Sequence, residues 1–152
     1  MRPRKDRSKR ARALRLWEWN EVRKAVPYLR SVIGSLREHW LDVLAAERRL
    51  EQAGKHPAPL KRAQIIQHET HQDERRRAQT KFDDALEELN GMEVFLLDPV
   101  QGLALIPFRK GDELAWYVFD HFTADGVAGW RYHHDPIEEC RTLNSLDVVA
   151  KV

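Results

Sequence analysis

The side chains best suited to metal chemistry lie in one short segment, His68-Glu69-Thr70-His71. The segment is similar to the helix of zinc proteases, but that helix needs its two histidines at i and i+4. The spacing here is i and i+3, which excludes the protease geometry. In a weaker alternative, antiparallel helix pairing sets residue 39 near residue 71. This would bring His39 and Asp42 close to His68 and His71, a set of ligand types that suits Zn²⁺. A solvated helix face is the simpler interpretation, so we assign no metal and keep His39, His68 and His71 only as candidates.

Cys140 is the single cysteine and the one candidate nucleophile. A reactive thiolate needs positive charge nearby, whereas Cys140 follows Glu138 and Glu139 and precedes Arg141. The seven glycines form no phosphate-binding or dinucleotide-binding fingerprint. We therefore assign no catalytic residue and no cofactor, and we favour a protein that is not an enzyme.

A strongly basic tail opens the chain. Residues 1–15 hold eight arginines and lysines against one aspartate, a net charge of +7, while the other 137 residues carry a net charge of −5. Such a run is expected to be disordered by itself, and it either acts as a solubilising tail or neutralises phosphates. Under the second alternative the nucleic-acid-binding residues are Arg2, Arg4, Lys5, Arg7, Lys9, Arg10 and Arg12.

Apolar residues recur at steps of four and three along residues 20–53, which predicts one long amphipathic helix. The members of this apolar stripe are Val22, Val26, Leu29, Ile33, Leu36, Trp40, Val43 and Leu50. We expect the helix to begin at an Asn20 N-cap and to stop at Gly54, with Pro27 marking either a kink or the true first turn. A second helix is expected over 60–89, so residues 20–90 form an antiparallel helical hairpin.

The second helix is polar in its middle, where Ala78 is the only apolar residue between positions 67 and 81. A polar neighbour does not cover the apolar stripe of the first helix. A second copy of the chain is the simplest partner that could bury this stripe, because two hairpins make a four-helix arrangement. We therefore predict a homo-oligomer whose interface contains Ile33, Leu36, Trp40 and Val43.

The segment 92–134 has the residue types and turns of a β-sheet. Runs at 92–97, 103–108, 113–119 and 127–133 are rich in β-forming residues and are separated by turn sequences. They predict a small antiparallel four-stranded β-meander, with Pro107 at an edge or a bulge. The expected register sets Trp116 opposite Arg131 and Tyr117 opposite Trp130, and a one-residue slip would pair Trp116 with Trp130. In either register we expect these aromatic side chains to be structural.

Together these elements give an α+β fold, a helical hairpin followed by the meander. The 152 residues fit one domain at 16–143, between the basic tail at 1–15 and a C-terminal extension at 144–152. No apolar run is longer than six residues, as at 103–108, which is far short of the ~20 residues of a membrane-spanning helix, so no membrane association is expected. The single cysteine and the absence of a secretory pattern favour a cytoplasmic location.

The order of several motifs resembles a bacterial family catalogued as domain of unknown function 2203. The motifs are LWEWNEVRKAVPYLR, LDPVQGLALIPF, LAWYVFD, GW-R and CRTL, and the resemblance covers roughly residues 16–143. The positions that fit the family pattern are Pro27, Gly102, Leu103, Pro107, Trp116, Trp130, Arg141 and Leu143.

Four positions bear on the chemistry of that family. The family's aspartate, cysteine and histidine fall on Leu105, Ala115 and Arg131, and its glutamate falls approximately on Asp120. If those side chains form a site in the family, this chain keeps only its packing residues. The family has no established activity, so the resemblance implies a fold and argues against an enzyme.

These observations lead to three candidate functions. The first is a non-catalytic, homo-oligomeric binding or scaffold module, with no small-molecule ligand assigned. The alternative is a nucleic-acid- or ribosome-associated protein that uses the basic tail for non-specific contacts. A metal-dependent enzyme is third.

Overall fold

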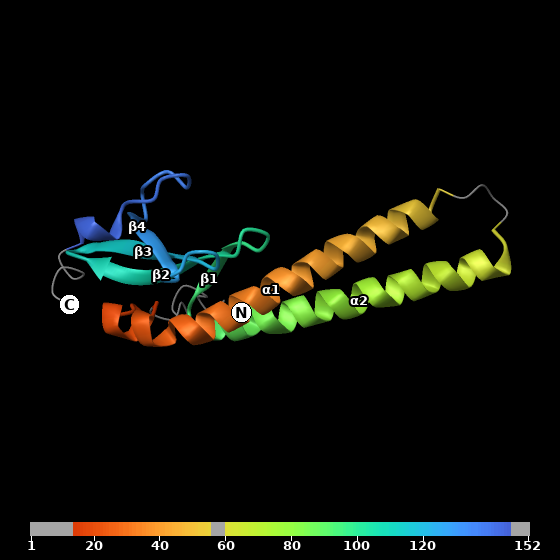
Figure 1. The fold of residues 1–152 in the computed structure, drawn as a ribbon, viewed down its shortest axis with the longest axis horizontal. Coiled ribbons are helices and arrows are strands. Elements are labelled where there is room, and N and C mark those ends of the chain that lie inside the picture. The colour runs from red at the N-terminus through yellow and green to blue at the C-terminus, as the bar shows by residue number, and fades with distance from the viewer. Residues whose placement is uncertain (1–13, 56–59, 147–152) are drawn as a thin grey trace, which may run out of the picture.

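The computed structural model describes residues 14–55 and 60–146, and it has the α+β fold expected from the sequence. Two helices, α1 (Trp19–Ala53) and α2 (Arg62–Gly91), precede four strands and a short 3₁₀ helix, η2 (Leu143–Ser145). The strands are β1 (Phe95–Asp98), β2 (Leu103–Lys110), β3 (Glu113–Asp120) and β4 (Val127–Tyr132). They pair antiparallel in the order β1-β2-β3-β4, which confirms the meander, and the helices lie against one face of the sheet (Figure 1).

The helix ends differ slightly from the expected ones. α1 starts two residues early, with Glu18 as N-cap, because the Glu21 carboxylate accepts a 3.1 Å hydrogen bond from the Glu18 N–H. Asn20 is therefore inside the helix. Pro27 is inside it as well, so it does not mark the first turn. Gly54 is the C-cap, as predicted, and α2 runs two residues later than expected at both ends.

The apolar stripe of α1 is buried within a single chain. Ile33, Leu36 and Val43 are each 0% exposed, and Trp40 packs on Phe82 of α2 with ring centroids 5.0 Å apart. Ile33 and Leu36 share one core cluster with the helix-facing residues of the sheet. The expectation that these four residues need a second copy as cover is thus wrong, because Ile33, Leu36 and Val43 are buried within one chain and Trp40 is covered by Phe82 of α2.

The register of the sheet agrees with the first of the two expected alternatives. Trp116 pairs with Arg131 and Tyr117 with Trp130, so the slipped register is wrong. β1 spans only the first three residues of β2, which leaves Pro107 with no strand on that side. There the Trp17 N–H donates a 2.8 Å hydrogen bond to the Pro107 carbonyl oxygen. Pro107 therefore lies where a missing N–H costs no strand pairing.

The hairpin continues well past the sheet (Figure 1). We call residues 44–53 of α1 and 62–79 of α2 the helical arm. Among its residues the structure buries only Ala46. Exposed ion pairs join the two helices instead, Arg75 to Glu47 at 3.2 Å and Arg49 to Glu74 at 3.3 Å. In the described parts of the chain, neither helix is apolar enough over a sufficient length to cross a bilayer.

Candidate binding surfaces

The sheet divides its aromatic residues between two faces. Side chains alternate along a strand, and directly paired residues share a face. Tyr117 and Trp130 are a pair on the helix-facing side, where they are 2% and 3% exposed. Their neighbour Trp116 therefore lies on the opposite, outer face, where it is half-buried. Tyr117 and Trp130 are core residues, whereas Trp116 is available to a partner.

Trp116 is the centre of an aromatic cluster on the outer face, which we call the aromatic platform and define as Phe95, Trp116 and His133. The Phe95 and Trp116 rings meet edge to face, with centroids 5.7 Å apart and an angle of 86°. The Trp116 indole N–H donates a 3.1 Å hydrogen bond to Nδ1 of His133. Phe95 is 37% exposed and His133 is exposed. The platform thus presents an exposed aromatic surface that is held in place by contacts within the chain.

Arg131, the strand partner of Trp116, places a positive charge beside the platform. Its side chain is only 6% exposed and donates a hydrogen bond to the backbone oxygen of Asp135. Its Nε–H has no hydrogen-bond partner among the described residues. Arg131 therefore has one buried guanidinium donor that no described group uses.

Asp135 and Arg141 hold the segment after β4 in place. The Arg141 guanidinium binds both carboxylate oxygens of Asp135, at 2.9 and 3.0 Å, and the Tyr132 N–H donates to the same carboxylate at 2.9 Å. The hydrogen bonds from Arg141 lower the pKa of Asp135 to about 2. Backbone hydrogen bonds between Arg141 and Trp130 attach this segment to β4. Arg141 and Trp130 therefore have structural roles, and the ion pair of Asp135 with Arg141 was not predicted from the sequence.

Other positions that resemble the family pattern also act in turns and packing. Gly102 has a φ of +68°, and a Cβ there would lie 2.6 Å from the Cβ of His121. The Asp120 carboxylate accepts a 2.9 Å hydrogen bond from the Phe122 N–H in the β3–β4 turn. None of these contacts requires a bound group.

A groove of about 390 Å³ lies between α1 and the start of β4. Its polar lining residues are Arg23 and Asp125, which form no ion pair with each other. The remaining lining residues are Trp19, Val26, Pro27, Val127 and Leu143. Pro27, a family-like position, is thus part of a mainly apolar groove.

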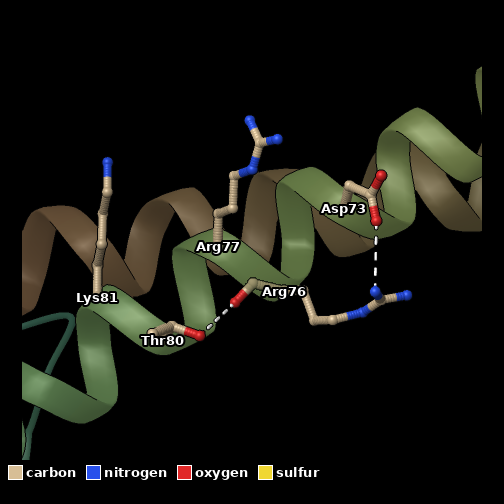
Figure 2. A pocket seen from close by; sticks show the side chains of 5 residues that line it. All are labelled: Asp73, Arg76, Arg77, Thr80 and Lys81. Carbon is tan, nitrogen blue, oxygen red and sulfur yellow. Dashed lines mark hydrogen bonds and ion pairs between the residues drawn. The ribbon is translucent and has the colours of Figure 1, made fainter.

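A second, more open hollow of about 560 Å³ lies along α2 (Figure 2). It is lined by Asp73, Arg76, Arg77, Thr80 and Lys81, which follow one another at helical spacing. Arg76 binds Asp73 at 3.4 Å, whereas Arg77 and Lys81 extend away from the helix and have no ion-pair partner within the described part of the chain (Figure 2). The hollow carries a net positive charge, but exposed side chains from a single helix line it.

The structure does not bring the metal candidates together. The contact of Trp40 with Phe82 places His39 near the level of residue 83 on α2. At ~1.5 Å per residue this level is about 18 Å from His71. The hairpin register expected from the sequence, residue 39 near residue 71, is therefore wrong. His71 contacts Glu74 and His68 contacts Gln72, both on their own helix. Among the described residues no three histidines, cysteines or acids are placed to hold a metal ion.

The Cys140 thiol is poorly suited to act as a nucleophile. Burial raises its pKa, and the nearby positive charge of Arg131 only partly offsets that effect. The thiol therefore stays protonated at neutral pH. The basic tail candidates, Arg2 to Arg12, lie outside the described residues.

Comparisons with known proteins add no relative. No family model, curated protein or solved structure matches the chain.

Proposed function

We propose that this chain is a non-catalytic binding module that associates with a second copy through its helical arm. The proposal rests on the apolar side chains that are exposed at the end of the helical arm. Ile65 and Ile66 on α2 are 46% and 54% exposed, and Leu60 just before them is 44% exposed. These side chains form an apolar patch at the far end of the hairpin from the sheet.

The weak internal packing of the arm supports the same proposal. Its described ion pairs are solvent-exposed, and such pairs contribute roughly 0–1 kcal/mol each. A helical hairpin gains most of its stability from buried apolar side chains, and this arm buries only Ala46 among its residues. Pairing with another arm would bury Ile65 and Ile66 in a four-helix arrangement, and two-fold dimers are the commonest oligomers.

Light scattering at micromolar concentration tests this proposal. The wild-type chain is expected to have a mass of about twice 17.9 kDa, and the double variant Ile65→Glu/Ile66→Glu the mass of one chain. Gln67→Glu, a polar change on the same helix, is the matched control and should leave the mass of the dimer unchanged. A wild-type monomer would refute the proposal, as would a dimer that survives the double substitution.

Association with nucleic acid is the second candidate. The hydrogen bond from Trp17 to Pro107 places the start of the described chain at the edge of β2. The basic residues from Arg2 to Arg12 precede this segment in the sequence. Binding to mixed-sequence RNA that weakens steeply with salt, and that is lost on removal of residues 1–13, is the expected result. A metal-dependent enzyme is the third candidate, and elemental analysis of untagged protein tests it.

A further inference from the structure

We infer that the groove between α1 and the start of β4 binds a small zwitterion, a free amino acid with an apolar side chain. The groove lies at the sheet end of the molecule, whereas the helical arm extends from the other end (Figure 1). The inference therefore goes beyond the proposed self-association and does not depend on it. The volume of about 390 Å³ is at the lower end of the ~300–1,000 Å³ range of ligand pockets, which suits a ligand of this size.

The apolar walls of the groove come from parts of the chain that are fixed to one another. Trp19 of α1 packs on Tyr117 of the sheet, with ring centroids 5.3 Å apart. Leu143 belongs to η2, which is held by a 3.1 Å hydrogen bond from the Trp130 indole N–H to the Thr142 carbonyl oxygen. An apolar side chain that enters the groove therefore meets a surface that is already formed.

The β3–β4 turn, which carries Asp125, is docked on α1. The Arg30 guanidinium donates a 2.9 Å hydrogen bond to the carbonyl oxygen of Ala124, the residue before Asp125. Gly126, the residue after it, has a φ of +81°, and a Cβ there would lie 2.7 Å from Cγ1 of Val26. The turn is thus held against the helix on both sides of Asp125, so the position of this residue relative to α1 is set before a ligand binds.

Arg23 of α1 and Asp125 of the turn place opposite charges along the same groove. Both residues are exposed, and neither forms an ion pair among the described residues. A ligand that carries a carboxylate and an ammonium group complements both, with its carboxylate on the Arg23 guanidinium and its ammonium on the Asp125 carboxylate. A ligand with a single charge leaves one of the two side chains unused.

Pro27 adds a hydrogen-bond acceptor to the groove. A helical carbonyl oxygen normally accepts a hydrogen bond from the N–H four residues later, and Pro27 has no N–H. The Arg23 carbonyl oxygen therefore lacks its helical donor on the side of α1 where Pro27 lines the groove. A primary ammonium has three N–H donors, one for this oxygen and others for the Asp125 carboxylate. The arrangement thus favours a primary ammonium over a fully methylated one.

Calorimetric titration of the full chain with L-phenylalanine tests the inference. Phenylpropionate lacks the ammonium group and phenylethylamine lacks the carboxylate, so each loses one charge-assisted interaction and should bind about tenfold more weakly. Glycine keeps both charges but has no apolar side chain, and it should also bind about tenfold more weakly. The trimethylammonium derivative of L-phenylalanine should bind more weakly than L-phenylalanine itself.

Two variants assign each charge of the ligand to a side chain. Arg23→Gln should weaken binding of L-phenylalanine about tenfold and bind phenylethylamine as the wild type does. Asp125→Asn should weaken binding of L-phenylalanine to a similar extent and bind phenylpropionate as the wild type does. Lys24→Gln and Asp84→Asn are the matched controls, since both residues are exposed and neither lines the groove, and they should bind L-phenylalanine normally. Circular dichroism confirms that each variant is folded.

Three results would overturn the inference. They are no binding of L-phenylalanine or L-leucine by the full chain at millimolar concentration, equal affinity for L-phenylalanine and both singly charged analogues, and an unchanged affinity in Arg23→Gln and Asp125→Asn. Light scattering on Arg23→Gln tests the other occupant, since a fall in mass would show that the groove instead binds a second copy. A wild-type monomer that binds L-phenylalanine would refute the proposed self-association and support this inference.

Discussion

The imidazole ring of His121 lies against Gly34 of α1, and its Cε1 is 2.9 Å from the position that a Gly34 Cβ would take. The backbone around His121 is fixed to the same helix by Arg30. The Arg30 guanidinium donates hydrogen bonds to the carbonyl oxygens of His121, Thr123 and Ala124, at 3.1, 3.3 and 2.9 Å. The β3–β4 turn is therefore docked on α1 at a position that only glycine can occupy without displacing the ring.

Gly34→Ala is expected to destabilise the protein, although glycine to alanine inside a helix normally stabilises by ~1 kcal/mol. The added methyl group meets the His121 ring, and overpacking of this kind costs about 1–3 kcal/mol. Urea denaturation measures the change. Gly91→Ala is the matched control, because nothing lies within 4 Å of the added atom. The double variant Gly34→Ala/His121→Ala should recover stability, and a failure to recover would contradict the proposed contact.

Leu36→Ala should lower the free energy of unfolding by about 2–5 kcal/mol, because the side chain is fully buried in the core. Leu41→Ala on the same helix should change it by about 0.5 kcal/mol or less, since that side chain is 36% exposed. Thermal or urea denaturation of both variants, with light scattering on each, is the measurement. An unchanged stability together with a fall in mass for Leu36→Ala would restore the interface expected from the sequence.

Low pH should destabilise the segment between β4 and η2. In the unfolded chain the Asp135 carboxylate has its ordinary pKa of 3.8, and in the folded chain the value is about 2. The unfolded state therefore binds the proton first, and the stabilisation from Asp135, complete above pH 4, is lost between pH 4 and pH 2. Carboxyl NMR titration measures the pKa directly. In Asp135→Asn this part of the pH dependence should be absent, and a titration of Asp135 near pH 4 would contradict the ion pair.

High pH should destabilise the folded protein through ionisation of the Tyr117 phenol. Burial raises the pKa of its phenol from 10.0 to about 12. The unfolded chain loses this proton first, so the contribution to stability is complete below pH 10 and is lost as the pH rises towards 12. Melting temperatures between pH 9 and pH 12 should fall less steeply in Tyr117→Phe than in the wild-type chain. Identical slopes would show that Tyr117 ionises without unfolding.

The sequence predicts the helices and strands of this fold better than it predicts which of them bury the apolar side chains of the others. Helical spacing and turn residues locate all four helix ends to within two residues, and cross-strand counting gives the pairing of Trp116 with Arg131. The apolar spacing of α1 identifies which side chains avoid water but not what covers them. Ile33 and Leu36 are covered by a sheet that begins about sixty residues further along the chain.

The candidate surfaces depend on register, which short-range patterns do not determine. The pairing of the helices follows from side-chain packing such as Trp40 on Phe82, which the spacing within each helix does not determine, so the predicted pairing of residue 39 with residue 71 is wrong. Trp116 and Tyr117 are adjacent in sequence and equally aromatic, yet Trp116 is half-buried on the outer face and Tyr117 is in the core. The ion pair of Asp135 was not predicted because its partner Arg141 is brought close only by the return of the chain along β4.

The order of the elements along the chain has a consequence for synthesis on the ribosome. The stripe of α1 that includes Leu29, Ile33 and Leu36 is made first, whereas the strands that cover it are made last. At about 5–20 residues per second, translation from Leu36 to Trp130 takes roughly 5–20 seconds. During that interval α1 has only the polar α2 as a neighbour. The nascent chain is therefore expected to need a chaperone that shields apolar helices until the sheet emerges.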